Sequence, residues 1–320
     1  MDLMVLWESE KPYYKKVNKY LKKKIQSLLI ENGIKAKVSK RVKDDISLRR
    51  KLLEKGNTKD AYDEICDKSG VRIELNFVDD LDKVAKIILS NFIEIKCEDK
   101  RKPTDPNWIG YQAIHIDIRI KDGEEIEERL KEIISEIQIK TLLQSAWSNN
   151  THDLTYKTDV RIPPQINRKT NLLNAMIEIA DNEFSSLVDK IDKIDEFSVF
   201  TLLFFLDDIF TGKIHIRNYH VNFTIFFLNS FFPYLNDKYG NKEFKEKFSD
   251  FVDSKIVTIR HCFDSRTPTE NAVVFFKQPE CILIFFLLNE DRYQFAEEWK
   301  KHFNIDDLET VASWFGISLD

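Results

Sequence analysis

Apolar residues recur at helical spacing near the start of the chain and then give way to short stretches with other periods. Residues 10–32 carry an apolar face of helical period, and Gly33 suits the end of that helix. Residues 34–42 predict a strand that leads into a second helix, running through Ser47 to Gly56. The pattern at the start is therefore helix, strand, helix.

The same alternation of element types continues to about residue 154. Residues 71–77 and 134–139 predict strands, and residues 113–120 alternate apolar and polar side chains with a period of two. Residues 79–91 and 142–154 return to helical spacing. Helices interspersed with strands predict the α+β class, with a mixed β-sheet flanked by helices.

The second half differs in pattern and composition. Of 24 Phe residues, only Phe77 and Phe92 precede Phe184. Amphipathic or buried helical patterns predominate, although residues 214–227 are also compatible with strands. We predict a mainly α-helical C-terminal region whose last helix opens at 306–309.

Pro163 and Pro164 mark a break between the two patterns. We predict two domains, residues 1–162 and residues 163–320. The simplest interpretation of the second is a helical domain whose Phe residues fill its own core, since buried Phe is the usual case. A dimerisation, sensing or autoinhibitory module is the alternative.

Composition indicates a globular protein, with 42% apolar and 32% charged residues. The longest apolar run, residues 281–288, is too short to span a membrane, and no secretory leader is recognisable at the start. The four cysteines are scattered and form no C-x-x-C pair. We therefore expect a cytoplasmic protein with reduced cysteines and no membrane partner.

The net charge of −5 hides a strongly basic segment. Residues 11–59 hold 17 Lys or Arg against four acids. Such a segment suits a surface that faces polyanions, either nucleotide phosphates or RNA, although a solvated helix face explains part of it equally well.

Two acids are placed to bind a metal ion. Asp67 stands just before a predicted strand, and Glu136 lies within another, on the same face as Gln138. A strand otherwise rich in Ile does not need Glu and Gln on one face. Carboxylates at neighbouring strand ends suit Mg²⁺ and nucleotide phosphates, although either acid alone is more often a solvated surface residue.

Cations gather around the first strand-to-helix turn. Arg41, Lys43, Arg50 and Lys51 surround Ser47 at the expected start of a helix. The backbone N–H groups of a helix N-terminus bind phosphate, and basic side chains complete the charge balance. Ordinary surface charge is the alternative for these residues taken alone.

The combination of motifs resembles the synthetase domain of the RelA/SpoT family over residues 10–160. The motifs, in order, are Arg41-x-Lys43-x₃-Ser47-x₃-Lys51, Asp67-x-x-Gly70-x-Arg72, Gly110-Tyr111-Gln112-x-x-His115, Glu136-x-Gln138-x-Lys140-Thr141 and His152-x₃-Tyr156-Lys157. The resemblance implies a nucleotidyltransferase-like fold. It also implies that ATP gives its β,γ-pyrophosphate to a ribose 3′-hydroxyl, classically of GDP or GTP, which makes a (p)ppGpp-type alarmone.

On the donor side the resemblance assigns three groups of residues. Asp67 and Glu136 would bind Mg²⁺, with Glu136 also a candidate for activating the acceptor hydroxyl. The adenine would lie between Arg41 and Arg72. The residues that face the ATP phosphates would be Lys43, Ser47 and Lys51.

On the acceptor side the assignments are less complete. Tyr111 would stack on the acceptor base, with Gln138 and His115 close to the acceptor as catalytic residues beside Asp67 and Glu136. His152 and Lys157 complete the acceptor group.

Three departures from the family pattern fall on this side: Asn107 stands where the family often has Lys, Thr151 where it has an acid, and Ser145 where it has Asn. Lys100, Arg101 and Lys102 lie just upstream and are expected to substitute for the missing Lys.

Because the departures concern the acceptor, two further functions stay open. Toxic small alarmone synthetases, which the chain also resembles, include members that modify the 3′ end of tRNA, and the basic segment suits an RNA acceptor. A non-catalytic nucleotide- or RNA-binding protein on the same fold is the third possibility. A homo-oligomer, and an antitoxin or regulator acting through the C-terminal half, are the expected protein partners.

Overall fold

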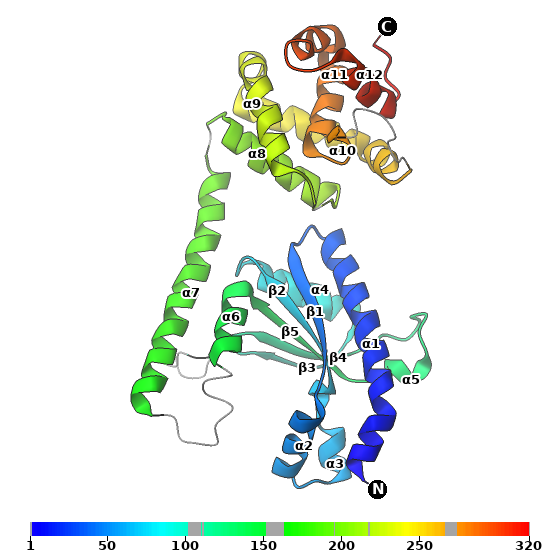
Figure 1. Ribbon diagram of the computed structural model, residues 1–320, viewed down its shortest axis with the longest axis vertical. Helices are drawn as coiled ribbons and strands as arrows, with labels where there is room; N and C mark the ends of the chain where they lie inside the picture. Colours follow the sequence, from blue (N-terminus) through cyan, green and yellow to red (C-terminus); the bar gives the residue numbers. More distant parts are fainter. Residues whose placement is uncertain are drawn as a thin grey trace. The chain divides into compact units, whose positions relative to one another are not determined.

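The computed structural model describes residues 2–101, 110, 112–151, 163–194, 196–216, 218–265 and 274–319. The chain divides into two compact units, Met1–Asp189 and Lys190–Asp320, which are described separately (Figure 1). The first unit holds a sheet with helices and the second is helical, as predicted for the α+β class. No helix within the described ranges is long and apolar enough to cross a bilayer.

One mixed sheet of five strands organises the first unit (Figure 1). Its strands are β1 (Ala36–Val42), β2 (Ser69–Leu75), β3 (Ile93–Asp99), β4 (Ile114–Arg119) and β5 (Ser135–Thr141). Their order is β1-β2-β5-β4-β3, in which β2 and β5 are parallel and the other neighbours are antiparallel. The sheet confirms four predicted strands and adds β3, which the sequence pattern did not reveal.

The two faces of this sheet differ because side chains alternate along each strand. One face is apolar, and residues such as Val71, Ile116 and Ile137 form a core with α1 (Leu3–Glu31) and α4 (Asp80–Asn91). The other face carries polar side chains, because Glu136 pairs in register with Gly70 on β2 and Asp117 on β4. One face of the sheet therefore packs in the apolar core, and the opposite face presents polar side chains.

Helix α1 begins seven residues earlier than predicted and contains Pro12. It ends as predicted, since Gly33 adopts a φ of 68°, a conformation that glycine tolerates without strain. The remaining helices of the first unit are α2 (Asp45–Glu54), α3 (Lys59–Asp63), α5 (Glu128–Lys131), α6 (Leu142–Thr151) and α7 (Pro164–Asp192), with a short 3₁₀ turn at Cys66–Lys68.

The observed units and the predicted domains differ in where they place helix α7. Helix α7 begins at Pro164, next to the predicted boundary. The compact units, however, divide at 189/190 and not at 162/163. Helix α7 therefore lies with the sheet, and the side-chain contacts that attach it are described below.

The second unit is a bundle of helices, as predicted. It contains α8 (Val199–Asp208), a π-helical turn at Ile209–Lys213, α9 (Val221–Lys238), α10 (Asn241–Ser265), α11 (Pro279–Trp299) and α12 (Ile305–Trp314). Residues 221–227, compatible with a strand by pattern, are helical because Thr224, Phe227 and Phe231 are buried at helical spacing. Aromatic side chains fill the core, as in the stacked pair Phe231 and Trp299 with ring centroids 5.6 Å apart.

Candidate active site

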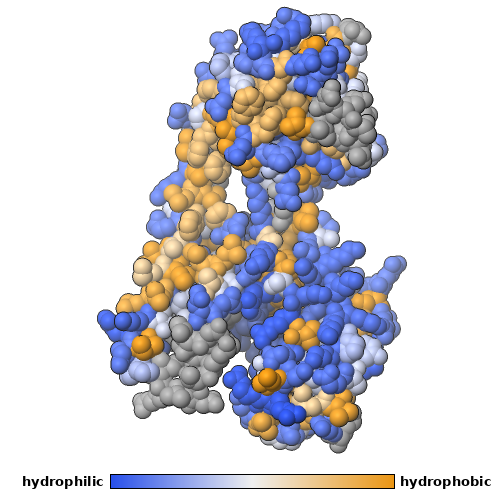
Figure 2. Space-filling model, in the orientation of Figure 1, coloured by the Kyte–Doolittle hydropathy of each residue, from blue (hydrophilic) through white to orange (hydrophobic). Residues whose placement is uncertain are grey.

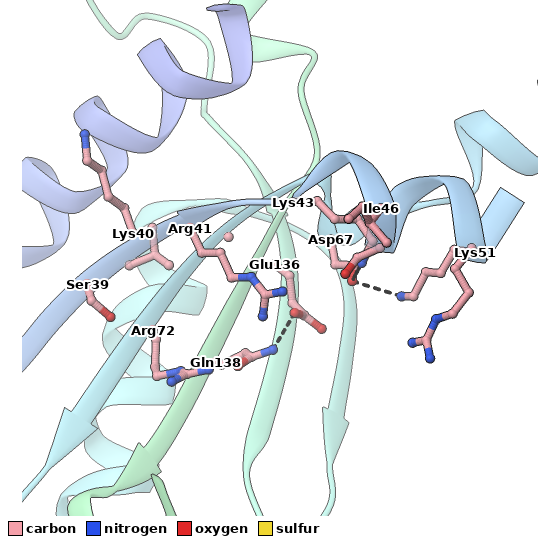
Figure 3. A pocket seen from close by; sticks show the side chains of 14 residues that line it. Ser39, Lys40, Arg41, Lys43, Ile46, Lys51, Asp67, Arg72, Glu136 and Gln138 are labelled. Atoms are coloured by element: carbon pink, nitrogen blue, oxygen red, sulfur yellow. Dashed lines mark hydrogen bonds and ion pairs between the residues drawn. The ribbon is translucent and has the colours of Figure 1, made fainter. Parts of the chain in front are cut away.

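A cavity of about 740 Å³ opens on the polar face of the sheet (Figure 3). It lies where β1 leads into α2 and where β2 and β5 run side by side. Its lining residues are Ser39, Lys40, Arg41, Lys43, Ile46, Ser47, Arg50, Lys51, Asp67, Gly70, Val71, Arg72, Glu136 and Gln138. The structure thus brings the predicted carboxylates and the predicted cationic turn into one site.

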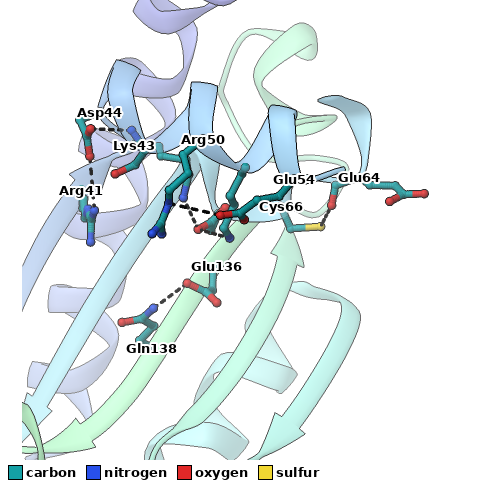
Figure 4. A network of polar contacts seen from close by, with 12 residues as sticks. Arg41, Lys43, Asp44, Arg50, Glu54, Glu64, Cys66, Glu136 and Gln138 are labelled. Carbon is teal, nitrogen blue, oxygen red and sulfur yellow. Dashed lines mark hydrogen bonds and ion pairs between the residues drawn. The ribbon is translucent and has the colours of Figure 1, made fainter. Parts of the chain in front are cut away.

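The cationic turn is built by the cap of helix α2. Asp44 has extended backbone angles and accepts a hydrogen bond from the backbone N–H of Ser47 at 2.8 Å (Figure 4). This cap starts the helix directly after β1, so Lys43 lies at the turn and Lys51 follows two helical turns later on the same side. The turn presents a helix N-terminus and two ammonium groups to the cavity.

Asp67 is the acceptor of both ammonium groups. The Nζ atoms of Lys43 and Lys51 lie 2.6 Å and 2.9 Å from its Oδ2 atom. Burial alone would raise the pKa of Asp67, but the hydrogen bonds and charges of the two lysines outweigh it and hold that pKa below its ordinary value. Asp67 is therefore a carboxylate at neutral pH.

Glu136 lies on β5, next to β2, and lines the same cavity. His115 Nδ1 lies 2.9 Å from its Oε1 atom, and Gln138 donates from Nε2 to Oε2 at 2.6 Å (Figures 3 and 4). Burial opposes the charge, yet the hydrogen bond and charge of His115, with the Gln138 bond, lower the pKa of Glu136. The neighbours thus fix both the orientation and the ionisation of this carboxylate.

The two carboxylates fit a magnesium ion that substrate phosphates help to hold. The Oδ1 atom of Asp67 is buried and has no hydrogen-bond partner among the described residues, so it is available as a ligand. No cluster of three or more His, Cys, Asp or Glu side chains suited to a metal occurs in the described part of the chain. Mg²⁺ at nucleotide sites commonly uses one or two carboxylates plus phosphate oxygens and water.

Two arginines flank the carboxylates from neighbouring strands. Arg41 is the last residue but one of β1, opposite Gly70, and Arg72 lies on β2 opposite Ser39, so both reach the cavity from the polar face (Figure 3). Arg72 donates to the Oδ1 atom of Asn149 on α6 at 3.2 Å. Two guanidinium planes beside one cavity are suited to stacking on a flat base.

The predicted acceptor residues are mostly beyond what the structure describes. Lys102, Tyr111, His152 and Lys157 lie outside the described residues, as does Asn107. Lys100 follows β3, where its backbone N–H bonds the carbonyl of Ala113 at 2.9 Å, and it does not line the cavity. Of the residues predicted to lie close to the acceptor, the structure therefore places His115 and Gln138 beside Glu136.

Two of the departures from the family pattern have structural partners. Ser145 is buried on α6 and donates its hydroxyl to the carboxylate of Glu74 on β2. Thr151 is also buried and donates to the backbone carbonyl of Trp147 at 2.8 Å. Both residues thus satisfy their hydroxyl groups inside the unit.

Two ionisable residues near the carboxylates, Asp117 and Lys140, received no role in the sequence analysis. Asp117 faces Glu136 across β4 and β5, and burial together with the Glu136 charge raises its pKa. Lys140 is fully buried, and burial together with the Arg72 charge lowers its pKa to about 8. Both positions follow from strand alternation, since Asp117 shares a face with His115 and Lys140 shares one with Gln138.

The family comparison agrees with this site. Residues 40–161 match the family model described as "Region found in RelA / SpoT proteins". The N-terminal part of the chain therefore carries a RelA/SpoT synthetase domain, which confirms the resemblance. This domain is distantly homologous to two proteins of Bacillus subtilis (strain 168), the GTP pyrophosphokinases YwaC and YjbM.

The homology is of low identity and covers part of each protein. YwaC is 30% identical over 145 residues, which are 44% of this chain and 66% of YwaC. YjbM is 25% identical over 154 residues, which are 47% of this chain and 70% of YjbM. The chain thus spans about two thirds of the length of these relatives.

A solved structure shows the same fold. The small alarmone synthetase 1 of Bacillus subtilis, bound to its product pppGpp, superposes with a TM-score of 0.52 at 23% identity. The superposition covers 58% of this chain and 98% of that one. At this identity the likeness concerns the fold.

Proposed function

We propose that the N-terminal unit is an ATP-dependent pyrophosphokinase that transfers the β,γ-pyrophosphate of ATP to the ribose 3′-hydroxyl of GDP or GTP. One observation carries this proposal: Asp67 and Glu136 face one cavity whose rim holds Lys43, Lys51 and Arg72. Phosphoryl chemistry depends chiefly on positioning and on charge stabilisation, and this cavity offers both.

The donor ATP is assigned to the cationic turn. Its phosphates would lie at the N-terminus of α2, close to Ser47 in the first turn and to the ammonium groups of Lys43 and Lys51. Its adenine would stack between Arg41 and Arg72. A bound Mg²⁺ ion, held by Asp67 and Glu136, would supply positive charge to the phosphate oxygens.

The acceptor hydroxyl is assigned to Glu136. Attack of the 3′-oxygen on the β-phosphorus forms the new P–O bond and breaks the bond between the β-phosphorus and the oxygen of the α-phosphate, so AMP leaves. The Glu136 carboxylate takes the hydroxyl proton, and His115 and Gln138 hold that carboxylate in place.

The location of the protein in the cytoplasm remains a prediction.

An RNA acceptor is the second candidate, and one observation favours it. Lys15, Lys19 and Lys23 are exposed on α1 and form no ion pair within the residues described. Unpaired lysines on one helix suit a nucleic-acid backbone, whose binding depends on cations and on salt. This candidate would transfer the same pyrophosphate to the 3′ end of tRNA, as toxic small alarmone synthetases do.

Labelled ATP separates these possibilities. Purified full-length chain is incubated with γ-labelled ATP, Mg²⁺ and, in separate reactions, GDP, GTP or bulk tRNA. We expect label in a guanosine nucleotide. Label in tRNA alone would support the second candidate, and label in neither, with AMP absent, would refute the enzymatic proposal in favour of a nucleotide- or RNA-binding protein.

Replacing Asp67 by asparagine is expected to weaken divalent metal binding at least about tenfold, because the neutral amide keeps the shape but loses the charge. Calorimetric titration with Mn²⁺, in the presence of a non-hydrolysable ATP analogue, measures this directly. Asp63→Asn on the exposed end of α3 is the matched control. Unchanged Mn²⁺ affinity in Asp67→Asn would remove Asp67 from the metal site.

A further inference from the structure

Helix α7 is attached to the sheet unit by its polar face. Within the described part of this helix the buried side chains are Asn174, Asp181 and Ser185. Ile177 and Val188 are half-buried, but most large apolar side chains of the helix are exposed, and Figure 2 shows apolar surface along it. The exposed ones include Leu172, Leu173, Met176, Ile179, Phe184 and Leu187. An amphipathic helix ordinarily buries its apolar face, so hydrophobic burial does not explain how α7 lies on this unit.

A ring of side-chain hydrogen bonds explains its position instead. Glu178 accepts from Nε2 of Gln112 at 2.9 Å, and Gln112 in turn accepts from Nε2 of Gln144 at 3.4 Å. Gln144 and Thr141 bond each other twice, each bond 3.0 Å long. The Thr141 hydroxyl closes the ring by donating to Asp181 at 2.7 Å.

The ring joins α6 and α7 to the two strands that carry the predicted acceptor side of the site. Gln112 precedes β4, which bears His115, and Thr141 ends β5, which bears Glu136 and Gln138. Gln112 and Thr141 belong to the motifs singled out in the sequence, yet neither received a role there. The amide of Asn174, one helical turn before Glu178, also bonds the backbone carbonyl of Gly110.

The ring lies far from the donor side along the strands. The cationic turn and Asp67 are at the end of β1 and just before the start of β2, whereas Thr141 is the last residue of the parallel strand β5. Seven residues of strand span about 20 Å. A change in the ring is therefore expected to act on the acceptor more than on ATP.

We propose that α7 is a positioning element of the acceptor side, acting through the ring Glu178–Gln112–Gln144–Thr141–Asp181. This inference rests on the proposed function, because it takes the acceptor to be a guanosine nucleotide. The ring adds side-chain bonds at the end of the ladder that pairs Ile114 with Ile139 and His115 with Gln138, and it ties this end of the ladder to α7. None of the ring residues needs to touch the acceptor for this role.

Exchanging the amide of Gln112 with the carboxylate of Glu178, which are hydrogen-bonded to each other, tests the proposal. Gln112→Glu places two carboxylates together and is expected to weaken GDP binding about tenfold, since small displacements of positioned groups are costly. Glu178→Gln alone keeps an acceptor oxygen and should change GDP binding less than about twofold. The double variant restores one donor and one acceptor and is expected to return to within about threefold of the wild type.

Binding of GDP and of a non-hydrolysable ATP analogue is measured by calorimetry on the full chain, and KM for each substrate accompanies it. The ATP affinity should stay constant, which also shows that the variants are folded. Thr141→Val and Thr141→Ser provide a second pair of test variants, because only serine retains a hydroxyl that can donate to Asp181. Glu183→Gln, on the exposed side of α7, is the control.

Two results would overturn the inference. One is a double variant no better than Gln112→Glu, and the other is an equal loss of ATP and GDP affinity, which a general structural role produces. If the wild-type chain transfers pyrophosphate but the double variant does not regain GDP binding, the inference about α7 is refuted and the proposed function stands. A wild-type chain that binds no GDP and forms no labelled product refutes the proposed function together with it.

Discussion

Replacing Glu136 by glutamine is expected to lower the turnover of pyrophosphate transfer by about 10³-fold, while KM for ATP changes less than about threefold. The amide can still accept the bond that Gln138 donates at 2.6 Å and remains beside His115, so the geometry of the site persists. What is lost is the negative charge, which the proposed mechanism uses to take the hydroxyl proton and to hold Mg²⁺. Steady-state formation of AMP and of the labelled nucleotide measures the effect.

The matched control is Glu132→Gln, close to the start of β5. Glu132 forms a solvent-exposed ion pair with Arg119 at 2.6 Å, and such pairs contribute little to stability. This variant should retain the wild-type turnover. Turnover of Glu136→Gln within about tenfold of the wild type would show that Glu136 is neither the base nor an essential metal ligand.

The polar face of the sheet could be predicted because alternation is a local property of a strand. Residues 114–119 alternate isoleucine with His115, Asp117 and Arg119, so the sequence alone places those three side chains on one face. The pairing of β4 with β5 then brings His115 Nδ1 within 2.9 Å of Glu136, a contact that the alternation alone does not give.

The contacts of Asp67 could not be predicted in this way. Lys43 and Lys51 converge on one oxygen of Asp67 because β1 pairs with β2 and because the Asp44 cap sets the direction of α2. Both conditions involve residues far apart in the chain. The strand β3 escaped prediction for another reason: it is an edge strand, and most of its side chains are exposed, so it lacks an apolar alternation.

Helix α7 shows a third limit of sequence reasoning. Its amphipathic pattern predicts a helix correctly, but the usual rule would bury the apolar side. The structure buries Asn174 and Asp181 instead, because their partners Gly110 and Thr141 are polar groups at the end of the sheet. Hydropathy alone contains no information about such partners.

The second unit contains a buried carboxyl group that makes its stability depend on pH. Glu280 lies in the first turn of α11 with no exposed surface. The hydroxyl of Thr224 donates to its Oε2 atom at 2.8 Å, and its Oε1 atom has no partner among the described residues. Burial raises the pKa of Glu280 from 4.5 to about 7, although its own backbone N–H and Thr224 partly oppose this.

The direction of the pH effect follows from these two pKa values. Below pH 4.5 both the folded and the unfolded chain carry the proton on Glu280. As the pH rises from 4.5 to about 7, the unfolded chain releases it and the folded unit keeps it, so the free energy of unfolding falls. The loss is about 3 kcal/mol in total, at 1.36 kcal/mol for each pKa unit.

Glu280→Gln is therefore expected to stabilise the second unit at pH 8 by about 3 kcal/mol relative to the wild type, and to leave it nearly unchanged at pH 4. Glutamine keeps an oxygen for the Thr224 hydroxyl but cannot ionise. Hydrogen exchange of the α9 and α11 amides in the full chain, corrected for the intrinsic pH dependence of exchange, measures the difference. Glu309→Gln on the exposed side of α12 should follow the wild-type curve, and a parallel pH dependence of Glu280→Gln and the wild type would show that Glu280 ionises normally in the folded unit.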